Sequence, residues 1–435
     1  MAKGTTAAGR NMPIGGSLPV RRPHLGFNFF DLDMFARGTP YDELARLRKN
    51  APVSWQLMPE GEGTDGFWLI TKHRDICEIE KNTTLFYSHA GSVLIDAPPA
   101  NAPPALMMVR DGFAHLDPPR HTTCRRLISP YFAPPTVAML EGCIRTHTSR
   151  LLDRAMSLRH LEFVDEMAVA LPVRVVFGEV LGFHPDDLQR AAQWGSLFNR
   201  VHAVRQTDYE FDALRVSAAV ALNQMYEYAL NSLQARRKTP TGDILSVLAN
   251  MRTADGELLT EEMFTSYFWS LVIGAFDTTA ATIAGGVLAL NQFPAEREKL
   301  YTDPSMVTCA VEEMLRWETP VIYFRRTASA DTKIRDKNIR RGQRVVMCYA
   351  AANRDEEVFT DPNVFNIVRH PNEHLAFGYG PHFCLGASLA RLEIKIFFEE
   401  MLIRGIHFEV CGNIVRERSN FINRIIRMPV KASVD

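Results

Sequence analysis

One apolar segment limits what this chain can fold into. Residues 263–290, MFTSYFWSLVIGAFDTTAATIAGGVLAL, carry a single charged side chain, Asp277, in 28 residues. Such a segment is long enough to cross a lipid bilayer, or to form the buried central helix of a large globular protein. A lone carboxylate at mid-membrane is costly, and no second segment supports a membrane topology. We therefore expect a buried helix in a protein without a membrane anchor.

The composition is that of a globular protein with no nucleic-acid partner. The 435 residues include 49 Lys and Arg against 50 Asp and Glu, so the formal charge of −1 offers no basic excess for a polyanion. Seven cysteines are scattered without a CxxC pair, which favours a reduced, cytoplasmic chain. Residues 1–25 are rich in small side chains and contain no signal-length apolar run, so we expect a flexible segment there. We expect residues 26–435 to form one domain.

Helical patterns dominate, and strand patterns are few, so the fold class is mainly α with a smaller β region. Residues 86–112, which contain four prolines, are expected to form one long loop. Strands are expected at 53–57 and 66–71. Helices are expected at 40–50, 75–81, 136–156, 164–181, 185–206, 214–236, 243–251, 260–290, 306–317 and 385–404.

The glycine-rich segment Phe377–Gly386, FGYGPHFCLG, contains the strongest candidate for chemistry, Cys384. A helix is expected to start directly after it, and the free N–H groups of a helix N-terminus favour a thiolate over a thiol. Gly380 and Gly386 permit unusual dihedral angles and the close approach of a flat ligand. These features indicate a thiolate metal ligand, although an isolated cysteine among glycines is also compatible with a plain loop.

Three further motifs carry polar groups at helical spacing. Glu313 and Arg316 are three residues apart and can pair. Asp277 and Thr278 lie inside the apolar segment, where an acid beside a hydroxyl can relay protons; the alternative is a threonine that bonds back to a helix carbonyl. His121 and Arg125, in HLDPPRHTTCRR, share one helix face and can bind an anion or simply be exposed.

The Cys384 segment closely resembles the haem-binding loop of the cytochrome P450 family, with its Phe, its Gly three residues on, a basic residue two before the Cys and a Gly two after. The resemblance implies the cytochrome P450 fold and haem b, with Cys384 as the thiolate ligand of iron. It also implies that Arg369 joins the Glu313–Arg316 pair in a structural network. The residues that the resemblance places around the haem are His121, Arg125, Arg326, Phe377, His382 and Gly386.

The resemblance implies a monooxygenase that uses O2 and electrons from NAD(P)H through ferredoxin reductase and ferredoxin, with Asp277 and Thr278 as the proton-delivering pair. Arg125, Arg126 and Arg391 are expected near the Cys384 side, where they can form a basic patch for an acidic ferredoxin. Two alternatives stay open: a peroxide-driven peroxygenase, which would not need Asp277 and Thr278, and a haem protein that binds a ligand without catalysis.

Apolar side chains suggest the substrate. The segments GQRVVM (342–347) and DEEVF (355–359) resemble bacterial members that oxidise sterols and terpenoids, but they lie outside the expected pocket and indicate kinship rather than specificity. From the apolar candidate pocket residues we expect an apolar small molecule: a steroid, a terpenoid or an alkyl-aromatic compound. Residues 194–211 are expected to form part of a lid. The candidate pocket residues are Val93, Leu94, Ile95, Leu106, Met107, Met108, Leu197, Phe198, Val321, Ile322, Phe324, Phe421 and Ile422.

Overall fold

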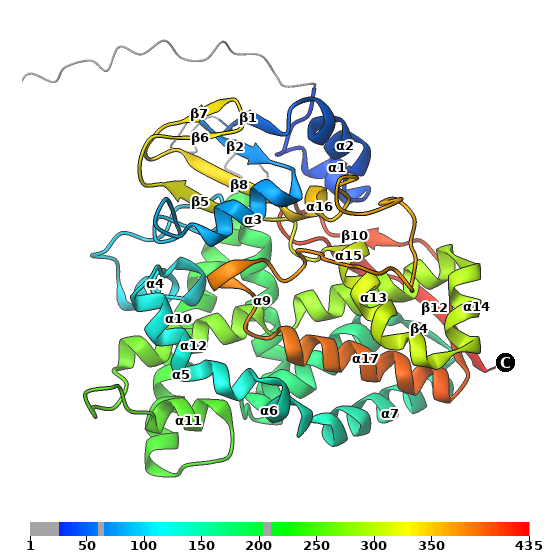
Figure 1. Ribbon diagram of the computed structural model, residues 1–435. Coiled ribbons are helices and arrows are strands. Elements are labelled where there is room, and N and C mark those ends of the chain that lie inside the picture. The colour runs from blue at the N-terminus through cyan, green and yellow to red at the C-terminus, as the bar shows by residue number, and fades with distance from the viewer. Residues whose placement is uncertain (1–25, 60–64, 203–209, 435) are drawn as a thin grey trace, which may run out of the picture.

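The computed structural model describes residues 26–59, 65–202 and 210–434, so the segment 1–25 lies outside the described residues. Helices form the larger part of the molecule, and the main sheet lies at one end (Figure 1). The helices are α1 Leu32–Ala36, α2 Tyr41–Asn50, α3 His73–Lys81, α4 Pro104–Arg110, α5 Arg120–Ile128, α6 Pro134–Ala138, α7 Glu141–Leu158, α8 Ala170–Pro172, α9 Leu188–Val201, α10 Phe211–Lys238, α11 Ile244–Asn250, α12 Glu261–Gly274, α13 Asp277–Gln292, α14 Pro294–Thr302, α15 Val307–Glu318, α16 Tyr349–Ala352 and α17 Ala387–Ile403.

The main sheet has the strand order β1-β2-β8-β5-β3, in which only β2 and β8 pair in parallel. Smaller sheets are β4-β12-β9, β10-β11 and β6-β7. The strands are β1 Val53–Leu57, β2 Gly66–Ile70, β3 Phe86–Tyr87, β4 His160–Glu162, β5 Tyr323–Ala328, β6 Thr332–Ile334, β7 Lys337–Ile339, β8 Arg344–Cys348, β9 Ile406–Val410, β10 Val415–Arg416, β11 Ile425–Arg427 and β12 Pro429–Val434. The expected mainly helical architecture with a smaller β region is confirmed.

The apolar segment lies inside the protein. Within Glu261–Gln292, 78% of the most apolar stretch is buried, which supports a core helix over a membrane span. The sequence predicted a single helix over this segment, which is wrong. The segment forms two helices, because α12 ends at Gly274 and α13 begins at Asp277. Between them, Phe276 turns its ring onto Phe177, with ring centroids 5.7 Å apart. A Cβ on Gly195 of α9 would meet this ring at 2.8 Å, so a glycine leaves room for it.

Two other expectations were wrong in detail. The expected loop 86–112 contains the short strand β3 and the helix α4, which Pro104 begins at its first turn. The helix expected at 164–181, with a disturbance near Pro172, is π-helical over Val164–Val169 and Val173–Val180, so the disturbance is confirmed and the regular α-helix on either side of it is not. Pro172 lies between these two π-helical stretches and has no N–H to donate, which accounts for the departure from a regular α-helix.

Candidate functional site

The Cys384 segment forms a closed loop before α17. The Cys384 N–H donates to the Phe377 carbonyl at 2.9 Å. Gly380 has φ 66°, and a Cβ there would come within 2.9 Å of the Glu80 carbonyl oxygen, so both its conformation and its contact favour glycine. Gly386 has φ −85°, so the expectation of an unusual dihedral angle at this position is wrong. Its possible role in admitting a flat ligand stays a prediction.

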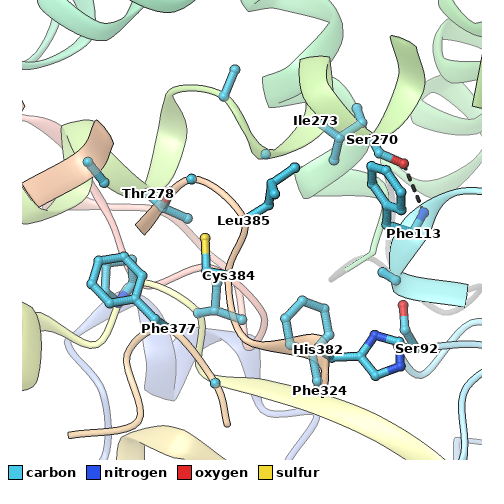
Figure 2. A pocket seen from close by; sticks show the side chains of 18 of the residues that line it. Ser92, Phe113, Ser270, Ile273, Thr278, Phe324, Phe377, His382, Cys384 and Leu385 are labelled. Atoms are coloured by element: carbon cyan, nitrogen blue, oxygen red, sulfur yellow. Dashed lines mark hydrogen bonds between the residues drawn. The ribbon is translucent and has the colours of Figure 1, made fainter. Parts of the chain in front are cut away.

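A cavity of about 360 Å³ lies between this loop and the helices α12 and α13. Figure 2 shows the Cys384 sulfur inside it, with Thr278 of α13 above the sulfur in this view. Every site residue predicted from the sequence lines this cavity except Asp277. The lining members are His121, Arg125, Thr278, Arg326, Phe377, His382, Cys384 and Gly386.

The Cys384 thiol lies deep in the protein but borders the open cavity. Burial raises its pKa, while the Gly386 N–H and the charges of Arg125 and Arg391 act in the opposite direction. The protein alone therefore does not hold this side chain as a thiolate. A bound cation would reverse that balance, because a metal deprotonates a coordinating thiol.

One edge of the cavity gathers basic side chains. The His121 and His382 rings lie 4.1 Å apart, and burial lowers the pKa of both, that of His121 to about 4, so both are neutral donors near pH 7. His121 Nδ1 is buried without a hydrogen-bond partner. The Arg125 side chain has no hydrogen bond or ion pair within the described ranges, and burial lowers its pKa. The cations Arg125 and Arg326 and the unpartnered Nδ1 of His121 lie at one edge of the cavity and form a site for an anion.

Asp277 does not line the cavity, although its partner Asn199 does. Asn199 Nδ2 of α9 donates to its carboxylate at 2.6 Å, and Ser196 Oγ donates at 3.3 Å. Arg424, from the turn between β10 and β11, also binds this carboxylate and pairs with Glu417 at 2.6 Å. The acid is therefore buried and paired, and the side chain of its partner Arg424 is 12% exposed.

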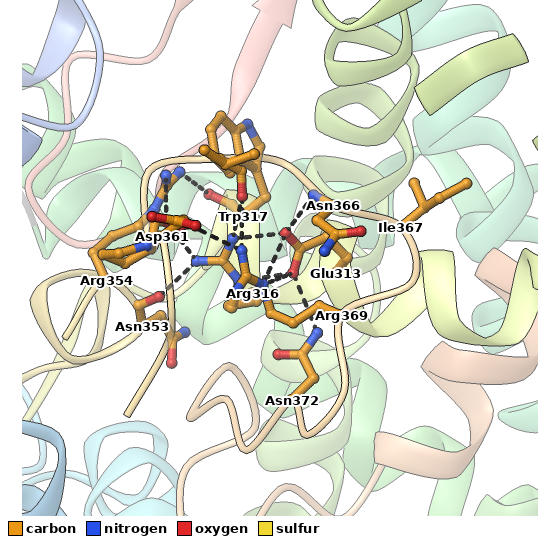
Figure 3. Close-up of polar contacts among 12 residues, drawn as sticks. Glu313, Arg316, Trp317, Asn353, Arg354, Asp361, Asn366, Ile367, Arg369 and Asn372 are labelled. Carbon is orange, nitrogen blue, oxygen red and sulfur yellow. Dashed lines mark hydrogen bonds and ion pairs between the residues drawn. The ribbon is translucent and has the colours of Figure 1, made fainter. Parts of the chain in front are cut away.

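The expected Glu313–Arg316–Arg369 network is confirmed (Figure 3). Arg316 donates to both oxygens of Glu313 at 2.7 Å, and both side chains are fully buried. Arg369 Nε donates to Glu313 Oε2 at 3.1 Å, and its other nitrogens bond backbone carbonyls of the segment 360–364. Arg316 also bonds the Asn353 carbonyl, and the Asn353 side chain accepts from Leu375 N–H at 2.6 Å. The network thus reaches the segment that leads into the Cys384 loop.

The predicted pocket residues are confirmed only in part. Those that line the cavity are Val93, Val321, Phe324, Phe421 and Ile422. Those that do not are Leu94, Ile95, Leu106, Met107, Met108, Leu197, Phe198 and Ile322. The expected lid over 194–211 includes α9 and Phe211, but its residues 203–209 lie outside the described residues. The lining residues that the sequence analysis missed include Val109, Phe113, Trp269 and Ile273.

The expected basic patch is smaller than predicted. Arg391 forms two hydrogen bonds with Glu312, at 2.7 and 2.8 Å, and its guanidinium lies 4.5 Å from the centre of the Phe377 ring. Arg125 lines the cavity. Arg126 is exposed, and the Arg391 side chain is 38% exposed but paired with Glu312.

Comparison with known proteins agrees with this geometry. The sequence pattern of the family described as cytochrome P450 matches residues 105–413. The chain is 33% identical to the steroid C26-monooxygenase of Mycolicibacterium smegmatis over 403 residues, 92% of each chain. It is 32% identical to the linalool 8-monooxygenase of Pseudomonas putida over 405 residues, 92% of this chain and 97% of that one.

The fold is shared as well. A Mycobacterium marinum cytochrome P450, CYP268A2, solved in complex with pseudoionone, superposes with a TM-score of 0.83 at 30% identity, covering 95% of this chain and 100% of that one. The cavity, the single cysteine loop and the Glu313 network thus occur in a chain that matches these proteins over nearly its whole length. The chain belongs to the cytochrome P450 family, the haem-iron oxidoreductases, and is a monooxygenase of the bacterial type.

Proposed function

We propose that this chain hydroxylates a neutral, apolar small molecule of the steroid or terpenoid class, or an alkyl-aromatic compound, in the cytoplasm. The observation that carries the proposal is a single cavity that holds Cys384, Thr278 and a mainly apolar wall. The relatives of this chain include a steroid monooxygenase and a linalool monooxygenase. Phe113, Trp269 and Ile273 supply apolar surface that a hydrocarbon skeleton can bury.

We propose haem b as the cofactor, and the residues present fit it. Cys384 offers one sulfur inside the cavity, and His121, Arg125, Arg326 and His382 offer donors for the two propionate carboxylates at one edge. His121 Nδ1, buried without a partner, is explained by an acceptor that arrives with the cofactor. The open space beside Gly386, where a Cβ would meet no protein atom within 4 Å, also fits a flat ligand. When bound, the haem supplies the activation of O2, and a thiolate ligand favours cleavage of the O–O bond.

The chain's own residues place the substrate and move protons. The apolar wall excludes water and orients the substrate toward the Cys384 side. The Thr278 side chain lines the cavity and is assigned to hold a proton at its hydroxyl oxygen. Asp277, linked to Arg424 and so toward the surface, is assigned to return protons to Thr278. Electrons are assigned to a ferredoxin and its reductase, with Arg126 on the docking face.

The test is a haem-spectrum titration of the purified protein with steroids, terpenes, fatty acids and alkyl-aromatics, followed by product analysis. A hydroxylated steroid or terpene formed with NADH, ferredoxin and ferredoxin reductase supports the proposal. Product formed with peroxide and not with NADH would identify a peroxygenase. Tight binding without any oxidised product would identify a ligand-binding haem protein.

A further inference from the structure

The basic edge of the cavity contains one carboxyl group that the sequence analysis did not select. Glu80 of α3 is 2% exposed and lines the cavity together with Arg326 and His382. The Tyr349 hydroxyl donates to Glu80 Oε1 at 2.6 Å, and Arg326 Nη2 lies 3.6 Å from the same oxygen. Glu80 Oε2 is buried and has no hydrogen-bond partner.

The positive charges at this edge of the cavity balance two negative charges but not a third. Arg125 and Arg326 are the two permanent cations of the described cavity wall, while His115, His121 and His382 are held neutral by burial. The two propionates of a haem bring two negative charges, which the two arginines balance. An ionised Glu80 beside them would be a third negative charge in a low-dielectric site, and like charges there disfavour ionisation.

We propose that Glu80 carries a proton when the cofactor is bound, and that its O–H donates a hydrogen bond to one propionate. The inference rests on the proposed haem site. Without the cofactor, Glu80 can ionise and pair with Arg326. With the cofactor, Arg326 turns to the propionate, and Glu80 takes up one proton from solvent. Haem binding and proton binding are then linked at this residue.

The surroundings of Glu80 agree with a proton near neutral pH. Burial raises its pKa to about 7, although Arg326, the Tyr349 hydroxyl and the Tyr379 N–H lower it. Of the other charged or titratable groups, Cys77 is one turn earlier on α3, and burial raises its pKa to about 11, so it stays neutral. The approach of a propionate would raise the pKa of Glu80 further, because it adds a negative charge.

The sign of the resulting pH dependence follows from linkage. At Glu80, the haem-bound protein holds a proton that the haem-free protein loses above about pH 7, so this residue weakens haem binding as pH rises. Relative to a variant with no ionisable group at this position, haem affinity should be unchanged below about pH 7 and should fall by up to about tenfold per pH unit above it. The Cys384 thiol loses its proton when it binds the metal, which acts in the opposite direction, so the contribution of Glu80 is read from the difference between the wild type and Glu80→Gln.

The test measures the rate of haem transfer from the holoprotein to excess apomyoglobin between pH 6 and 9. Glu80→Gln keeps a donor that cannot ionise, so the transfer rate of the wild type divided by that of Glu80→Gln should rise as pH rises above 7. Glu78→Gln, at an exposed position of the same helix, should behave as the wild type.

A second variant tests the same group without removing it. Tyr349→Phe deletes a hydrogen bond to the ionised carboxylate, so the onset of haem loss should move to higher pH. The same pH dependence in the wild type and in Glu80→Gln would overturn the inference while leaving the haem site intact. A protein that takes up no haem at all would instead contradict the proposed function.

Discussion

Asp277 and Thr278 are consecutive residues, yet their side chains lie in different surroundings. The Thr278 side chain lines the cavity that holds Cys384, whereas the Asp277 carboxylate does not and is bound by Asn199, Ser196 and Arg424. We propose that the Thr278 hydroxyl and the Asp277 carboxylate are the two ends of a proton relay. The break between α12 and α13 at Ala275 and Phe276 directly precedes this pair.

Replacing Thr278 by Ala should leave haem uptake and substrate binding unchanged, because the side chain makes no contact that the fold needs. NADH and O2 should still be consumed, but more of the electrons should end as hydrogen peroxide. The measurement is product and peroxide formed per NADH. Thr265→Ala, in α12 and outside the cavity wall, is the control and should keep the wild-type yield. An unchanged yield in Thr278→Ala would assign this threonine to packing.

Replacing Asp277 by Asn should lower turnover by about a hundredfold, the size of a typical general-acid contribution, while coupling stays high. Arg424→Gln should lower turnover less, because Asn199 and Ser196 still hold the carboxylate. The readout is kcat with its solvent deuterium isotope effect, which should rise in both variants. If Asp277→Asn had the wild-type kcat and isotope effect, the acid would have no part in proton delivery.

Replacing Glu313 by Gln should destabilise the protein by about 3–5 kcal/mol, because Arg316 and Arg369 would lose their buried counter-charge. The measurement is urea unfolding of the haem-loaded protein. Glu166→Gln removes the partner of Arg154 at the surface, where the arginine side chain is 57% exposed, and should cost far less stability than Glu313→Gln. If both variants lost the same free energy of unfolding, the Glu313 network would stabilise the protein no more than a surface ion pair does.

Replacing Arg126 by Glu should slow reduction by a ferredoxin and reduce the dependence of that rate on salt, because one attractive charge on the docking face becomes repulsive. Arg46→Glu, on α2 beside the main sheet, supplies the same charge change elsewhere and should have little effect. Stopped-flow reduction at several ionic strengths gives both rates. If the rate of reduction depended neither on ionic strength nor on Arg126→Glu, Arg126 would not belong to the surface that binds ferredoxin.

The sequence was sufficient where local patterns determine the structure. The strand Val53–Leu57 was predicted with the bounds observed, and α10 and α15 were predicted to within a few residues, because their periodicity and flanking residues are clear. The Cys384 loop and its neighbours could be found because their spacing is fixed within short segments. The network of Glu313 and Arg369 needed the family resemblance, since the two residues are 56 apart in sequence.

The rest depends on long-range packing. Arg424 is 147 residues from Asp277, so nothing local indicates that they meet. The bend at Phe276 requires the space that Gly195 leaves on another helix. Glu80 could have been selected from the sequence, because its position on α3 continues the buried face of His73, Ile76 and Cys77. Glu78 does not lie on this face. Periodicity alone identified that face but not the cavity beyond it.

The most direct test of the account is the absorption spectrum of the reduced carbon monoxide complex. We predict the strongly red-shifted Soret band of thiolate ligation in the wild type. Cys124→Ala should keep the band, since this buried cysteine lies outside the cavity wall, and Cys384→His should lose the shift while still binding haem. A Cys384→His protein that retained the red-shifted band would contradict the assignment of Cys384 as the iron ligand.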